Sequence, residues 1–162
     1  MITSPDLKFI LSRPAYFIAF GFGSGLSPFA PGTAGTLAAF PIYGLIYLLG
    51  LNPAAYFALL LGLFVIGVWA SHATGRALGI ADHGGIVWDE IVAFFAILYF
   101  TPHTWFWFIA AFFIFRLFDI WKPFPIRYFD MHIKNGFGVM FDDALAAVYS
   151  IVLIKGLVWM MS

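Results

Sequence analysis

Two pairs of adjacent acidic residues are the strongest chemical signal in this sequence. Asp89 and Glu90 open the apolar segment WDEIVAFFAILYF, and Asp142 and Asp143 open FDDALAAVYSIVLI. Neighbouring side chains on a helix diverge by about 100°, so one member of each pair can face a common point while the other faces elsewhere. Four carboxylates from two helices could then converge on one cation. Oxygen ligands in a chain without cysteine indicate a hard cation, Mg2+ most naturally, and Mg2+ commonly binds together with phosphate.

A simpler explanation of these acids is that they complement the positive ends of helix dipoles, a contribution of about 0.3–1 kcal/mol each. That accounts for one acid per helix. It explains poorly why each of two strongly apolar helices keeps two adjacent charges, because an unpaired charge in a membrane helix costs about 2.5–3.5 kcal/mol. We therefore favour a functional cluster.

The segment FRLFDIWKPFPIRYFD carries a second group of charges. Arg116, Asp119 and Lys122 recur every three residues and would share a broad helix face. Arg116, Lys122 and Arg127 could hold a phosphate, with Asp119 binding metal or orienting an arginine. The alternative, which we weigh equally for Arg127 and Lys134, is a belt of basic side chains that reach lipid headgroups.

The loop FGFGSGLSPFAPGTAGTL precedes a long apolar run. Ser27, Thr33 and Thr36 offer hydroxyl groups, Gly32 permits close approach of the backbone, and free amides at the start of the following helix can bind an anion. The sequence is not a Walker loop, because the GK[ST] signature is absent. We expect this loop to contact the phosphate of a substrate.

The histidines contribute less to the chemistry. His72, His83, His103 and His132 share no metal-ligand spacing, and a lone histidine is more often structural. Only His83, in IADHGGIVWDE, is a candidate site residue, as a proton donor or a phosphate contact.

The composition is that of a protein with an apolar surface. Of the 162 residues, 63% are hydrophobic and 10% are charged, whereas about 25% are charged in an ordinary soluble domain. One core of this size cannot bury that excess, so we expect an integral membrane protein forming a single domain over 1–162. Zero net charge argues against a nucleic-acid partner, and the absence of cysteine excludes disulfides and cysteine nucleophiles. The oligomeric state stays open.

An all-α membrane bundle is the architecture that the hydrophobic pattern predicts. Residues 7–22 are apolar but interrupted by charges and Pro14, which suits a helix lying in the membrane interface. Because Asp6 and Pro14 are untypical of a signal peptide, we expect this segment to be retained. The hydrophobic segments lie at 35–50, 53–71, 88–100, 105–118 and 138–161. The third and fourth are short for a hydrocarbon core of about 30 Å, so 88–118 is either two thin crossings or a re-entrant hairpin.

Five crossings would gather the polar loops on one side of the membrane. The short links at 49–53 and 100–105 would lie on the opposite side from the loops at 21–34, 72–88 and 119–137. The basic residues Arg76, Arg116, Lys122, Arg127 and Lys134 all fall on the loop side. By the positive-inside rule this side is cytoplasmic.

Four motifs in order give the chain a family resemblance. Across roughly residues 20–150 the chain resembles the phosphatidylglycerophosphatase A family of bacterial lipid phosphatases. The motifs that carry the resemblance are GFGSGLSPFAPGTAGT, DHGGIVWDEIVAF, FRLFDIWKPFPIRYFD and GFGVMFDDALAA. The resemblance implies a Mg2+-dependent enzyme of the inner membrane that removes the terminal phosphate of phosphatidylglycerophosphate. Matched by position, the motifs of the family fall on these residues: Asp89, Glu90, Arg116, Asp119, Lys122, Asp142 and Asp143.

The resemblance and the charges lead to a mechanistic hypothesis with open alternatives. Asp89, Glu90, Asp142 and Asp143 would hold one or two Mg2+ ions, while Arg116 and Lys122 clamp the phosphate. One aspartate could instead be a covalent nucleophile. The substrate could be another lipid phosphomonoester. From a different class of protein, intramembrane carboxylates could serve a cation transporter, although that function favours acids near the middle of the bilayer.

Overall fold

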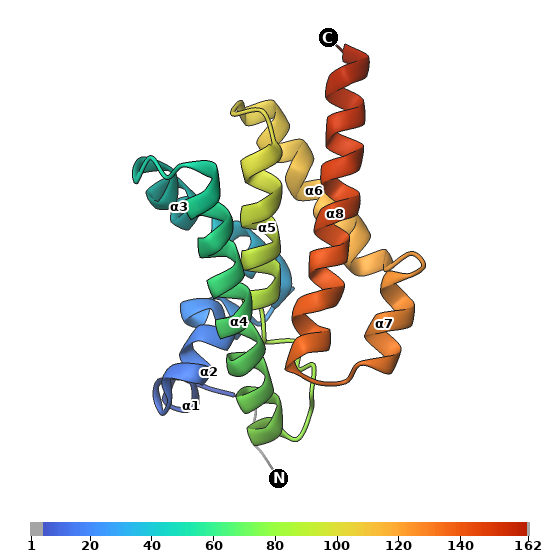
Figure 1. The fold of residues 1–162 in the computed structure, drawn as a ribbon. Helices are drawn as coiled ribbons and strands as arrows, with labels where there is room; N and C mark the ends of the chain where they lie inside the picture. The colour runs from blue at the N-terminus through green and yellow to red at the C-terminus, as the bar shows by residue number, and fades with distance from the viewer. Residues whose placement is uncertain (1–4, 162) are drawn as a thin grey trace.

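Every regular element in residues 5–161, the part of the chain that the computed structural model describes, is helical (Figure 1). The elements are α1 Leu7–Leu11, α2 Pro14–Ala19, the 3-10 helix η1 Gly21–Leu26, α3 Pro31–Leu48, α4 Pro53–Leu78, α5 Trp88–Phe100, α6 Trp105–Trp121, α7 Ile126–His132 and α8 Gly136–Met161. The five predicted apolar segments correspond to α3, α4, α5, α6 and α8. The all-α prediction is therefore confirmed.

Within the described residues, α4 and α8 are the helices long and apolar enough to cross a membrane. Each has 26 residues, and their most apolar windows have mean hydropathies of 2.1 and 1.9. Only 22% of each window is buried, whereas the core helix of a soluble protein would be mostly buried. Their outward faces therefore suit a lipid environment better than water.

The short helix α5 forms the centre of the bundle. It contacts α3, α4, α6 and α8, and in Figure 1 it lies between α4 and α8. Phe94, Phe95 and Ile97 are essentially inaccessible to solvent. Because α5 is enclosed from its first turn onwards, Asp89 and Glu90 lie inside the protein although they begin a helix.

The polar connections gather at one end of the bundle, as predicted. In Figure 1 the α3–α4 and α5–α6 links lie towards the end that carries the C-terminus, whereas α1, α2, α7 and the loop after α4 lie at the other. The two short links end at capped helices, because Asn52 accepts a hydrogen bond from the Ala55 N–H and Thr104 accepts one from the Trp107 N–H. The first turn of α5 points towards the loop end.

The structure differs from the sequence prediction near several helix ends. The single interfacial helix expected over 7–22 is divided, because Arg13 is extended and Pro14, which lacks an N–H, begins a new helix. The first of the predicted apolar segments begins its helix at Pro31 rather than at 35, so Thr33 and Thr36 belong to α3 and not to a loop. The short helix α7 within 119–137 was not predicted.

Candidate active site

Three buried carboxylates meet where the first turn of α5 contacts α8. One oxygen each of Asp89, Glu90 and Asp143 lies within 4.8 Å of the others. These residues are only 7%, 9% and 2% exposed. Asp89 Oδ1, Glu90 Oε2 and Asp143 Oδ2 are buried and have no hydrogen-bond partner within residues 5–161. Because buried carboxylates are normally paired or coordinate a metal, this triad could bind a metal ion.

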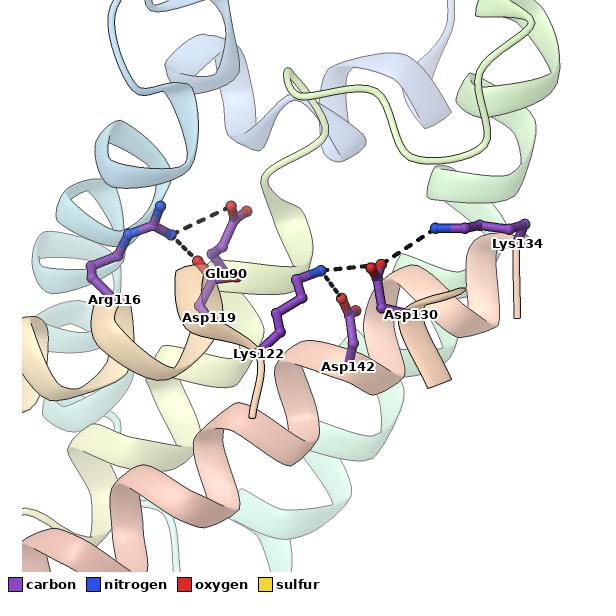
Figure 2. A network of polar contacts seen from close by, with 7 residues as sticks. All are labelled: Glu90, Arg116, Asp119, Lys122, Asp130, Lys134 and Asp142. Carbon is purple, nitrogen blue, oxygen red and sulfur yellow. Dashed lines mark hydrogen bonds and ion pairs between the residues drawn. The ribbon is translucent and has the colours of Figure 1, made fainter. Parts of the chain in front are cut away.

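The fourth predicted carboxylate, Asp142, lies outside the triad. It bonds the Lys122 ammonium, which is also 3.1 Å from Asp130 Oδ1. Lys134 extends this chain of charges, with its Nζ 3.5 Å from Asp130 Oδ1 (Figure 2). The two adjacent aspartates of α8 thus face different partners, as the divergence of neighbouring helical side chains requires.

Lys122 connects the end of α6 to α7 and α8. It is the C-cap of α6 and adopts the left-handed backbone conformation, with φ 47°, which is uncommon for a residue other than glycine. Burial of the ammonium opposes its charge, but Asp142 and Asp130 outweigh burial and raise the pKa of Lys122 above its ordinary value. Lys122 is therefore a fixed cation beside the triad residue Asp143.

Arg116 provides a second cation, close to the triad residue Glu90. It bonds Asp119, three residues further along α6, and its Nη1 lies 3.6 Å from Glu90 Oε1 (Figure 2). Of the two roles predicted for Asp119, orientation of an arginine is the one that the structure contains. Arg116 Nε is buried and has no hydrogen-bond partner in the described residues.

The glycine-rich loop reaches the site through the first turn of α3. A Cβ atom on Gly32 would overlap Glu90 Oε1 and lie 3.1 Å from both terminal nitrogens of Arg116. The helix begins without a side-chain cap, because its N-cap is Ala30 in the left-handed conformation, and Pro31 has no N–H. The start of α3 therefore borders Glu90 and Arg116 directly, and glycine is needed there for the close approach.

The hydroxyl groups predicted in the loop have local hydrogen bonds. Thr36 is buried and donates to the Gly32 carbonyl at 2.9 Å, and Ser27 donates to the Phe29 carbonyl at 2.8 Å. Thr33 is half-buried in the first turn of α3. A contact between these three side chains and a phosphate remains a prediction.

Two other predicted residues lie in supporting or outer positions. His83 Nδ1 accepts a hydrogen bond from the Gly85 N–H at 3.0 Å and so shapes the loop that leads into α5. Arg127 is exposed on α7. The sequence interpretation did not assign Asp130 a role, although its spacing of four residues from Lys134 is typical of a helical ion pair.

Comparisons with known proteins identify the family of this chain. Residues 17–158 match the family described as phosphatidylglycerophosphatase A. A phosphatidylglycerophosphatase A of Haemophilus influenzae is 44% identical over 98% of both chains, and one of Escherichia coli is 45% identical over 86% of this chain and 81% of its own. A Bacteroides thetaiotaomicron protein with the provisional name phosphatidylinositol-3-phosphatase is 42% identical over 92% of this chain and 98% of its own. No solved structure matches. The chain belongs to the phosphatidylglycerophosphatase A family.

Proposed function

We propose that this protein hydrolyses the terminal phosphomonoester of phosphatidylglycerophosphate, giving phosphatidylglycerol and inorganic phosphate, with Mg2+ held by Asp89, Glu90 and Asp143. Membership of the family supports the substrate. The observation that carries the site is the set of three buried carboxylates, each with an oxygen that has no partner among the described residues, together with the guanidinium of Arg116 near Glu90.

The donor set fits Mg2+. The ligands are oxygen atoms only, and Mg2+ prefers oxygen and usually completes its coordination with water and substrate phosphate. When bound, the ion supplies electrostatic stabilisation of the phosphoryl oxygens. Asp142, which pairs with Lys122 in the structure, would act by holding that lysine in place.

The basic residues would position the phosphoryl group. Arg116, oriented by Asp119, can donate two parallel hydrogen bonds to phosphoryl oxygens. The uncapped first turn of α3, with Gly32 and Thr33, offers backbone N–H groups to the same anion. Lys122, which already pairs with Asp142 and Asp130, would add positive charge near the phosphoryl group.

The hydrolysis adds water across the P–O ester bond, so the phosphorus gains an oxygen and the glycerol oxygen leaves with a proton. A triad carboxylate would accept the proton of the attacking water. The alternative is attack by an aspartate, which would form an aspartyl-phosphate that water then hydrolyses. Rapid acid quenching with 32P-labelled substrate distinguishes the two, because only the second leaves label on the protein.

Phosphate release by the purified protein tests the function directly. We expect turnover of phosphatidylglycerophosphate with Mg2+, loss of turnover in EDTA, and recovery when Mg2+ is restored. Phosphatidylinositol-3-phosphate serves as the comparison substrate, because a relative bears the name of that activity. A higher kcat/KM for that lipid would replace the proposed substrate, and full turnover in EDTA would exclude the metal.

We further propose that α3, α4, α5, α6 and α8 cross the bacterial inner membrane, with the triad towards the cytoplasm. Basic residues at the loop end support this orientation. The chain has no cysteine, so single cysteines report on topology. In intact cells stripped of the outer membrane, we expect an impermeant maleimide to label Asn52→Cys and His103→Cys, but to label Gly84→Cys only after lysis. The reverse labelling pattern would show that the orientation is inverted. Labelling at position 52 but not at position 103 would indicate that 88–118 is a re-entrant hairpin.

A further inference from the structure

A groove between α4, α5 and α8 runs along the apolar part of the bundle and ends at the triad. Its volume is about 320 Å³, at the lower end of the range for small-molecule sites. The lining residues are Leu60, Leu61, Phe64, Asp89, Val92, Ala93, Ala96, Met140, Ala144, Ala147, Val148 and Ile151. All of these are apolar except Asp89, so the groove suits a hydrocarbon over most of its length.

The shape of the groove follows from small residues on two helices. Ala93 and Ala96 on α5 face Ala144 and Ala147 on α8, and their short side chains leave the space between the helices open. From the level of Met140 the lining continues for eleven residues of α8, roughly 16 Å at the rise of an α-helix. The groove is thus long and narrow.

The two sides of the groove have opposite character. Leu61 is 65% exposed and Val148 is 54% exposed, so the groove opens on the apolar outer faces of α4 and α8. At its inner end lies Asp89, which is buried and whose Oδ1 has no hydrogen-bond partner in the part of the chain that the structure describes. A ligand that fills this space must be apolar where it contacts α4 and α8 and must have an ionic group at the triad.

We infer that the groove binds one acyl chain of the lipid substrate and admits that chain sideways from the bilayer. The identity of this lipid, phosphatidylglycerophosphate, is taken from the proposed function, on which the inference rests. A soluble phosphomonoester would have no use for an apolar channel that leads from the lipid-facing surface to a catalytic carboxylate. A diacyl lipid combines the required long hydrocarbon and phosphate in one molecule.

Filling the groove should discriminate between substrates with long and short chains. Ala96 is half-buried and lies two turns of α5 beyond Asp89. We expect Ala96→Leu to raise the KM for dioleoyl phosphatidylglycerophosphate about tenfold, as expected if roughly two methylene groups lose their contacts. The kcat/KM for the dihexanoyl substrate should stay unchanged. Ala110→Leu, at a half-buried position of α6 outside this groove, is the matched control. Equal losses for both substrates, or no change for either, would overturn the inference.

A binding measurement separates this inference from the proposed function. The protein with Ala96→Cys or Ala110→Cys is treated with a small thiol reagent in detergent, together with dioleoyl or dihexanoyl phosphatidylglycerol. We expect the dioleoyl lipid alone to slow labelling, and only at position 96. If no lipid protects position 96 in an enzyme that still releases phosphate, the groove does not bind the acyl chain, and the proposed function is unaffected. If the dioleoyl lipid protects position 96 in a protein without phosphatase activity, the groove binds the chain, and the proposed function is excluded.

Discussion

Asp143→Asn is expected to lower kcat for phosphate release by about 10²- to 10³-fold, the range seen when one preorganised electrostatic contact to a transition state is lost. Asp143 is the most buried member of the triad, and the amide replaces a carboxyl group whose Oδ2 has no hydrogen-bond partner among the described residues. The Mg2+ concentration for half-maximal activity should rise as well, because the donor set loses one negative charge. Steady-state kinetics over a series of Mg2+ concentrations measures both effects.

Two variants and one further measurement make this prediction specific. Asp142→Asn, one residue earlier, should reduce activity without changing the half-saturating Mg2+ concentration, because Asp142 pairs with Lys122. Asp6→Asn should leave both quantities unchanged, since asparagine can replace aspartate as the N-cap of α1. In EDTA, Asp143→Asn should not lower the thermal unfolding midpoint, because it removes one of three crowded carboxyl groups, which repel one another whenever they ionise. A lower midpoint together with unchanged Mg2+ dependence would make Asp143 a structural residue.

The sequence predicted which side chains gather at one end of the bundle, but not how they pair. The lengths of the hydrophobic segments predict where the helices begin, and the acids lie near two of these starts. Because successive crossings run in alternating directions, those two starts are predicted at the same end of the bundle. Whether Asp142 or Asp143 faces α5 depends on the rotation of α8, which is set by packing. Gly67 of α4 lies against Met140, and Gly136 lies against the Val68 carbonyl. Contacts of this kind between distant segments leave no local pattern in a sequence.

The differences at the N-terminus and at α7 have local causes. The break in 7–22 follows from the backbone restriction that Pro14 places on Arg13, which is extended, so that α2 begins anew at Pro14. Residues 126–132 are too few for their periodicity to indicate a helix. Their position becomes clear only from contacts, because Tyr149 of α8 donates a hydrogen bond to the Phe124 carbonyl just before α7.

The glycine-rich loop offers a test in which activity and stability should separate. Gly32→Ala places a methyl group where the Glu90 carboxylate lies and close to the guanidinium of Arg116. Both obstacles are the ends of flexible side chains, so the protein can fold by moving them. The movement displaces a triad oxygen and the proposed phosphate contact together, and misplacement of catalytic groups by about 1 Å can lower a rate about 10²-fold. We therefore expect kcat/KM to fall about 100-fold while the thermal unfolding midpoint changes little.

Gly44→Ala is the matched control for this change, because it lies in the same helix and a Cβ atom there meets nothing within 4 Å. Replacing a glycine inside a helix by alanine usually stabilises by about 0.5–1 kcal/mol, so Gly44→Ala should keep full activity and unfold at a slightly higher temperature. If Gly32→Ala retained the activity of Gly44→Ala, the start of α3 would have no part in the site. If it unfolded far below the control, close packing rather than catalysis would explain the glycine. A large loss of activity in a protein as stable as the control is the result that assigns the first turn of α3 to the active site.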